Sequence, residues 1–145
     1  MLTFENSLTF SSNEEPDAQL RNFWGAENGF IWSSGQWCEL TFSFDTKSAD
    51  KNGLLDLILD IDVFKNGDEL KGQNVLLYLN GLRIGSLFCT KRSTMVFSFD
   101  ARLLKAEENV FTMDTPDATS PSLFGSKDTR TLGVQLFSMQ VRKVE

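Results

Sequence analysis

Four aromatic residues of this chain are of a type that could make a flat contact with a ligand. Trp32 and Trp37 flank a Ser-Ser-Gly turn, while Trp24 and Tyr78 lie elsewhere in the sequence. An aromatic ring presents an apolar face, and its N–H or O–H group remains available for a polar partner. Such a ring can stack on the C–H face of a sugar. We therefore take Trp24, Trp32, Trp37 and Tyr78 as candidate ligand-binding residues.

The alternative for the tryptophans is a structural place. Trp24 and Trp32 could close one end of the core beneath a long loop. Trp37 differs, because the alternation of apolar and polar residues puts it on the same side as Glu39 and Thr41. Trp37 is therefore expected on a polar outer face, and an error of one residue in the register would reverse this.

Carboxylates on one predicted strand form a second group. Asp56, Asp60 and Asp62 alternate with apolar residues, so they share a face, with about 7 Å between positions i and i+2. With Asp45 or Glu39 from a neighbouring strand they could bind Ca²⁺ through oxygen ligands, and Asp60 and Asp62 are the metal candidates. A carboxylate pair could also serve a glycosidase. The alternative is a solvated face whose charges oppose edge pairing.

A third group lies in the sequence Gly-Ser-Lys-Asp-Thr-Arg-Thr-Leu-Gly of residues 125–133. Asp128 and Arg130 could pair with each other, or Arg130 could pair with Glu27 from another long loop. A fork between arginine and carboxylate would fasten the two loops together. In the alternative, Glu27, Asp128 and Arg130 are ligand-binding residues whose polar groups contact sugar hydroxyls.

The sequence lacks the residues on which several common catalytic sites and zinc sites depend. The chain has no histidine, which excludes the Ser-His-Asp triad, the Cys-His pair and zinc sites built on histidine. Nucleotide-binding and Cys-x-x-Cys motifs are also absent. Cys38 and Cys89 lie in apolar runs and are expected to be buried free thiols, with a single disulfide as the alternative. We predict a protein that is not an enzyme and needs no cofactor, with Ca²⁺ left open.

Length and charge restrict the partners. The 145 residues are expected to form one domain, residues 1–145. No apolar run approaches the roughly 18 residues that span a membrane, so membrane insertion is not expected. The net charge is −6 and no basic run exceeds two residues, which makes a nucleic-acid partner unexpected. The first 16 residues show no secretory signal pattern. The expected location is the cytoplasm or a larger complex.

The elements that must position these side chains are strands. Apolar residues alternate with polar ones in residues 37–45 and 54–64, which is typical of half-buried strands. Asn80-Gly81 predicts a tight hairpin within residues 74–89, and Gly85 predicts a bulge there. One short helix is expected after Asp100 as its N-cap.

About eight or nine short strands and two long connections, residues 11–29 and 115–130, complete the pattern. Loops of that length in a compact domain are usually functional or cross a face of the sheet. The fold class is therefore all-β, an antiparallel β-sandwich (jelly roll) with one short helix.

The order of several short motifs, from about residue 20 onward, resembles a jelly-roll carbohydrate-binding-like module. Such modules occur in bacterial polysaccharide-handling proteins, often appended to glycosyltransferases. The 145 residues contain no glycosyltransferase, so the resemblance implies binding and not synthesis. The matching residues are Glu27, Trp32, Ser33, Gly35, Asn80, Gly81, Leu103, Leu104, Ser120, Pro121, Asp128, Arg130, Leu132 and Gly133.

Two functions of different classes follow. The leading hypothesis is a non-catalytic carbohydrate-binding module that recognises a bacterial polysaccharide through aromatics and carboxylates. The alternative is a structural or decoration subunit of a larger assembly, including a homo-oligomer, because jelly rolls serve capsids as well as lectins. Thirteen phenylalanines would suit such a subunit contact. A carboxylate-based glycan-active enzyme is the third hypothesis.

Overall fold

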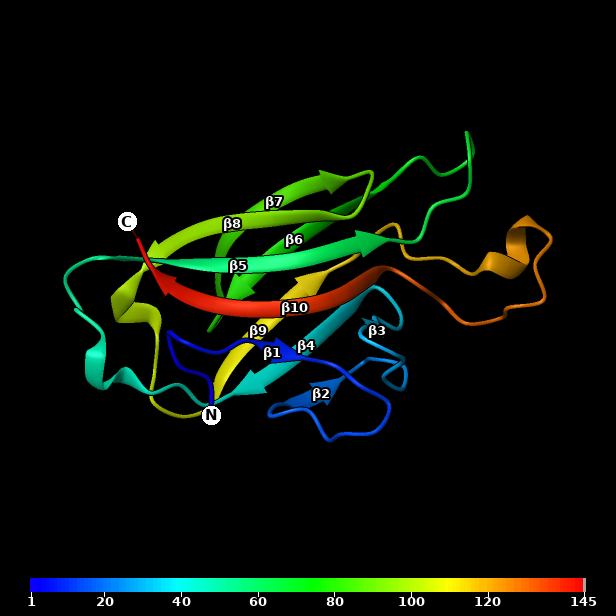
Figure 1. Ribbon diagram of the computed structural model, residues 1–145. Coiled ribbons are helices and arrows are strands. Elements are labelled where there is room, and N and C mark those ends of the chain that lie inside the picture. The colour runs from blue at the N-terminus through cyan, green and yellow to red at the C-terminus, as the bar shows by residue number, and fades with distance from the viewer. Residues whose placement is uncertain (145) are drawn as a thin grey trace.

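The computed structural model describes residues 1–144 as two antiparallel sheets packed face to face (Figure 1). In the first sheet, strands β10, β5 and β8 lie side by side. Both β1 and β3 pair with β10 on the edge opposite β5. The second sheet has the order β2-β4-β9-β6-β7. The first sheet comprises β1 (Leu8–Thr9), β3 (Ile31–Trp32), β5 (Leu54–Val63), β8 (Ser93–Asp100) and β10 (Val134–Lys143). The second comprises β2 (Gln19–Arg21), β4 (Trp37–Phe42), β6 (Gln73–Leu79), β7 (Leu82–Cys89) and β9 (Asn109–Asp114).

The strand pairs are nested. β3 pairs with β10, β4 with β9, β5 with β8 and β6 with β7. The chain thus behaves as one long hairpin, folded so that successive pairs fall alternately in the first and the second sheet. This arrangement is a jelly roll, and it confirms the predicted fold class.

Alternation along the strands divides core from surface as the sequence predicts. The inward residues of β4, Cys38 and Leu40, are fully buried, as are Leu57, Leu59 and Ile61 of β5. Aliphatic and aromatic side chains from both sheets form a single core. Cys38 and Cys89 are both free thiols in this core. Burial raises the pKa of the Cys38 thiol, which makes it an unreactive packing residue.

The hairpin between β6 and β7 turns at Asn80-Gly81, where both residues have positive φ, 50° and 84°. This confirms the predicted turn. The Asn80 side chain donates to Leu103 O at 2.7 Å and to Asn109 Oδ1 at 3.1 Å. The buried Asn109 amide in turn donates to Phe42 O at 3.2 Å. These amides fasten the hairpin tip to the connection before β9.

The helical content of the described residues consists of three short 3₁₀ helices, η1 (Thr46–Ser48), η2 (Ala101–Leu103) and η3 (Pro121–Phe124). The helix expected after Asp100 is η2, and the Asp100 carboxylate accepts from the Arg102 N–H at 2.9 Å as its cap. Within residues 1–144 no helix has the length and apolar character needed to cross a membrane.

Two bulges interrupt the ladders. Leu77 of β6 is opposite Gly85 of β7, but the next residue, Tyr78, is opposite Arg83. Ile84 is thus left without an opposite residue, which is the bulge predicted at Gly85. A Cβ on Gly85 would lie 2.3 Å from the Phe97 ring, which explains why glycine occupies this position. In β10 the register shifts between Leu136 and Ser138, at Phe137.

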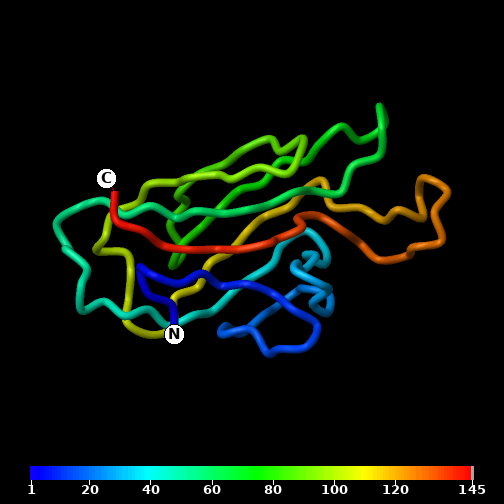
Figure 2. The backbone as a smooth tube through the Cα atoms, viewed as in Figure 1, coloured from blue at the N-terminus to red at the C-terminus, as the bar shows by residue number. Residues whose placement is uncertain are grey.

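Two loops extend from one end of the sandwich (Figure 2). Residues 115–131, which carry η3, project beside the loop of residues 64–72 at that end (Figure 2). The rings of Phe64 and Phe124 join the two segments, with their centroids 6.2 Å apart. The candidate residues near 128–131 therefore lie at the base of a projecting loop.

Candidate functional site

The structure divides the predicted site residues among three places. Trp37 and Tyr78 lie on the solvent-facing side of the second sheet, which we call the outer face. Trp32 lies on the corresponding side of the first sheet. Four residues at the base of the projecting loop come together in one contact network: Trp24, Glu27, Asp128 and Arg130.

One row of side chains crosses the outer face on all five strands of the second sheet. Arg21 of β2 is opposite Glu39 of β4, and Glu39 is opposite Thr112 of β9. Thr112 is opposite Tyr78 of β6, which is opposite Arg83 of β7. Because opposite residues in antiparallel strands point to the same face, this row combines an aromatic ring with a carboxylate, a hydroxyl and two guanidinium groups.

A second row runs beside the first. It begins at Trp37 of β4, which is opposite Asp114 of β9, and continues through Leu76 of β6 to Ser86 of β7. Trp37 and Tyr78 thus belong to strands separated only by β9, about 10 Å apart at the usual strand spacing. The two rings occupy one continuous surface among polar groups.

Trp37 is the most accessible of the three tryptophans, with 36% of its surface exposed. Strand parity predicted this outward position. The Arg21 guanidinium carbon lies 5.3 Å from the centroid of the Trp37 ring, and Arg21 Nη1 lies 3.6 Å from Glu39 Oε2. Trp37 is thus held at the surface by a cation that is itself held by a carboxylate.

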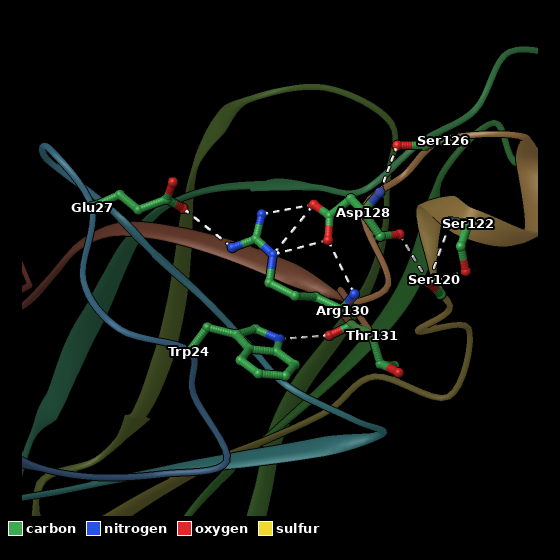
Figure 3. A network of polar contacts seen from close by, with 8 residues as sticks. All are labelled: Trp24, Glu27, Ser120, Ser122, Ser126, Asp128, Arg130 and Thr131. Carbon is green, nitrogen blue, oxygen red and sulfur yellow. Dashed lines mark hydrogen bonds and ion pairs between the residues drawn. The ribbon is translucent and has the colours of Figure 1, made fainter.

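The network at the base of the projecting loop is an arginine fork (Figure 3). Arg130 Nε and Nη2 donate to the Asp128 carboxylate at 3.1 and 2.8 Å. Arg130 Nη1 lies 3.7 Å from Glu27 Oε2, which belongs to the other long connection. Beside them, Trp24 Nε1 donates to Thr131 O at 2.9 Å. The sequence offered Asp128 and Glu27 as alternative partners of Arg130, and the structure shows both contacts together. We call Trp24, Glu27, Asp128 and Arg130 the clasp.

The charges of the clasp support one another. The Arg130 side chain, by hydrogen bonding, holds the pKa of Asp128 below its usual range, and Asp128 in turn raises the pKa of Arg130. One edge of the Arg130 guanidinium is occupied by Asp128. This geometry gives the clasp a structural role, which is to tie two segments about a hundred residues apart.

Trp32 takes the outward position of β3, because its neighbour Ile31 points into the core. It therefore does not close the end of the core, the alternative that the sequence left open. The Phe30 and Trp32 rings meet edge to face at 6.4 Å, and Phe30 lies 5.6 Å from Phe137. Arg92 covers Phe137, with its guanidinium carbon 3.6 Å from the ring centroid. Trp32 thus belongs to an aromatic cluster on the first sheet.

The predicted metal candidates each have a cation as partner. Asp60 accepts from Arg92 Nε and Nη2 at 3.1 and 2.9 Å, and Asp62 lies 3.2 Å from Lys65 Nζ. The third aspartate of the strand, Asp56, accepts from Ser98 Oγ at 2.7 Å. Within residues 1–144 no three acidic, histidine or cysteine side chains are grouped so as to hold a metal. Ca²⁺ at Asp60 and Asp62 stays a prediction, which would require both cations to give up these carboxylates.

Several residues of the outer face were not predicted from the sequence. Arg21, Thr112 and Arg83 lie on strands whose neighbours cannot be read from alternation alone. The alternation of β9 is as clear as that of β4, so the outward positions of Thr112 and Asp114 could have been predicted. Which strands lie beside β9 could not, because that depends on the topology.

No protein-family model matches the chain, and a search among curated proteins finds no match either. The solved structures that are similar in backbone include three carbohydrate-binding modules. A CBM36 module in complex with calcium and xylotriose is 10% identical, with a TM-score of 0.47 over 94% of this chain and 98% of that chain. A module named CsCBM6-3, from Clostridium stercorarium in complex with cellobiose, is 10% identical, with a TM-score of 0.46 over 99% and 98%. A module of Cellvibrio mixtus lichenase 5A in complex with cellotriose is 8% identical, with a TM-score of 0.49 over 97% and 98%. At this level of similarity no residue of this chain is matched to a ligand contact of theirs.

Proposed function

We propose that the chain is a non-catalytic carbohydrate-binding module that recognises a bacterial polysaccharide through the outer face of its second sheet. The observation that carries this proposal is the presence of Trp37 and Tyr78 on one open face, with polar side chains in register around them. The resemblance of the sequence motifs to modules of bacterial polysaccharide-handling proteins suggests the source of the glycan.

The side chains of the outer face match what a sugar requires. A pyranose offers an apolar C–H face, for which an exposed indole or phenol ring is a suitable platform. Its hydroxyl groups need donors and acceptors at the edge of that platform, and Glu39, Thr112 and Asp114 stand there. Because the face is open, much of a bound glycan would remain in water, and the affinity is expected to be modest.

Isothermal titration calorimetry against bacterial capsular and exopolysaccharide fragments tests the proposal, with and without Ca²⁺. At least one fragment should bind saturably, and Trp37→Ala should weaken that binding by about tenfold or more, as the loss of a central aromatic contact does. Val96→Ala is the matched control, since Val96 is 55% exposed and lies on the first sheet. Unaltered chain length of the bound glycan would agree with a non-catalytic role.

The proposal would be wrong if no fragment bound, or if Trp37→Ala and Val96→Ala affected binding equally. Cleavage of a fragment by the wild-type protein would favour a glycan-active enzyme. The calcium arm also tests the metal candidates, because binding that needs Ca²⁺ should be lost when Asp60 or Asp62 is replaced.

A structural subunit is the second candidate, favoured by the exposed edges of both sheets. Leu82 and Phe88 of β7 and Val96 of β8 are exposed by 57%, 56% and 55%. Apolar side chains along unpaired edge strands are typical of contacts with another chain. Light scattering at high protein concentration distinguishes the two, because an assembly subunit should associate and a binding module should stay monomeric.

A further inference from the structure

The bulge in β7 decides which side chains of that strand reach the outer face. Leu77 is opposite Gly85, and with an uninterrupted ladder Tyr78 would be opposite Ile84. The register shift instead places Arg83 opposite Tyr78. Ile84 packs against the core, and the guanidinium group takes the outward position beside the phenol ring. The bulge therefore brings a cation next to an aromatic ring.

Arg83 differs from the other arginines in its surroundings. Arg21, Arg92, Arg102 and Arg130 each pair with a carboxylate, and Arg142 Nε donates to Gln140 Oε1 at 2.9 Å. Within residues 1–144 Arg83 has neither an ion-pair partner nor a side-chain hydrogen bond. Its exposed donors are available to a ligand.

A hollow of about 410 Å³ lies against Arg83 at the β6–β7 side of the outer face. Leu76, Phe88 and Pro116 provide its apolar wall, and Asn74 and Ser86 provide polar groups. Arg83 is the one charged residue among those that line it within residues 1–144.

Two carboxylates stand near this hollow, and neither neutralises Arg83. Asp117 Oδ2 accepts from the Asn74 N–H at 2.7 Å and from Asn74 Nδ2 at 3.0 Å. This carboxylate is therefore bound to Asn74 and not to Arg83. Asp114 is on β9, separated from β7 by β6, which is about 10 Å at the usual strand spacing. The hollow thus has a positive charge, Arg83, on its β7 side, and the negative charge of Asp114 lies on its other side, on β9.

We propose that the outer face prefers an acidic glycan, in which a uronic-acid residue stacks near Tyr78 and places its carboxylate on Arg83. This inference rests on the proposed function and goes beyond it by naming the charge class of the sugar. A guanidinium group binds a carboxylate through two parallel hydrogen bonds, a geometry that a lysine does not offer. A neutral sugar would leave this cation without a counter-charge.

The test uses three pairs of oligosaccharides, namely oligogalacturonate, oligoglucuronate and oligomannuronate, each with its carboxyl-reduced form. The two members of a pair share linkage and length and differ in charge. Calorimetry on the wild-type protein should give an affinity about tenfold higher for at least one acidic form than for its reduced form, as expected for a charge-assisted contact. Added salt should narrow the difference, since the site is exposed.

Variants assign the preference to one residue. Arg83→Gln should abolish the difference while leaving the affinity for the reduced form within about twofold, and Arg83→Lys should restore part of it. Arg142→Gln is the matched control, because Arg142 is also exposed and lies on the first sheet. Thermal unfolding of each variant checks that the fold is intact.

Equal affinity for acidic and reduced forms, or a difference that Arg83→Gln leaves unchanged, would overturn this inference and leave the binding function standing. Failure of every glycan to bind, acidic or reduced, here and among the fragments above, would overturn the proposed function and this inference with it.

Discussion

Arg21 and Trp37 lie against each other on the outer face, with the guanidinium carbon 5.3 Å from the ring centroid. The cation covers one side of the indole, and Glu39 holds the cation in turn. Under the proposed function, a glycan that stacks on the opposite side of the ring need not displace Arg21.

Arg21→Ala should thus change glycan affinity by no more than about fivefold, because a cation–π contact at an exposed site contributes about 0.5–1 kcal/mol. Titration of the same glycan that detects the loss in Trp37→Ala measures this effect. A gain of tenfold in Arg21→Ala would contradict this view, because it would mean that Arg21 competes with the glycan for the ring.

The clasp should control the mobility of the projecting loop. Arg130→Ala removes the contacts of Arg130 with Asp128 and with Glu27, so residues 115–131 should open more often. Chymotrypsin should then cut at Leu123, which is 75% exposed, about threefold faster than in the wild-type protein. Arg142→Ala should leave the rate unchanged, and equal rates in all three proteins would show that the clasp does not hold the loop.

The cap of η2 gives a dependence of stability on pH. Hydrogen bonding to the Arg102 side chain, chiefly, lowers the pKa of Asp100 to about 2, against about 3.9 in an unfolded chain. A carboxyl with a lowered pKa in the folded state contributes stability that is present above the unfolded value. That contribution is lost as the pH falls through the folded value.

The difference in the free energy of unfolding between wild type and Asp100→Asn should therefore be constant above about pH 5 and shrink between about pH 4 and pH 2. Urea unfolding at a series of pH values measures it. A difference that persisted undiminished at pH 2 would mean that the carboxylate charge is not what stabilises the cap.

The buried Asn109 amide should be essential for stability. Its Oδ1 accepts from the Lys105 N–H at 2.8 Å, and its Nδ2 donates to Lys105 O at 2.7 Å and to Phe42 O at 3.2 Å. Asn109→Leu leaves these backbone groups without partners in the interior, which should cost about 2–4 kcal/mol. Denaturant unfolding measures the loss. Asn52→Ala on an exposed loop should stay within about 0.5 kcal/mol, and an equally small change in Asn109→Leu would disprove the claim.

The bulge glycine should not tolerate a side chain while Phe97 is present. Gly85→Ala would place a methyl group 2.3 Å from the Phe97 ring and should destabilise the fold by about 1–3 kcal/mol. In a background of Phe97→Leu, the same change should cost clearly less, because the shorter side chain leaves room. Additive losses in the double variant would mean that Phe97 is not the cause.

The strands and their inward faces could be predicted from the sequence because alternation and the Asn80-Gly81 turn are local signals. The link from Arg130 to Glu27 could also be predicted, since a lone arginine beside carboxylates in two long loops has few other partners. The outer face could not be assembled in this way. Placing Tyr78 near Trp37 requires that β9 lie between β4 and β6, which is a property of the topology.

The bulges mark the other limit of prediction. Gly85 signalled the one in β7, but its consequence for Arg83 depends on the pairing of β6. No residue type signalled the bulge at Phe137, so the aromatic cluster with Phe30 and Trp32 was not expected. Both cases involve a change of one residue in register, which reverses the face of every side chain beyond it.

The nesting of strand pairs also determines the order in which the chain can fold during synthesis. β6 and β7 meet as soon as their turn leaves the ribosome, whereas β3 must wait for β10. The hydrogen bond from the Val134 N–H to Ser33 Oγ closes a gap of 101 residues. β5 also waits for β10, since Val63 pairs with Val134, although its other partner, β8, is made earlier. Until β10 arrives, one edge of β5 is left unpaired. The completion of the first sheet is thus set by the arrival of its final strand.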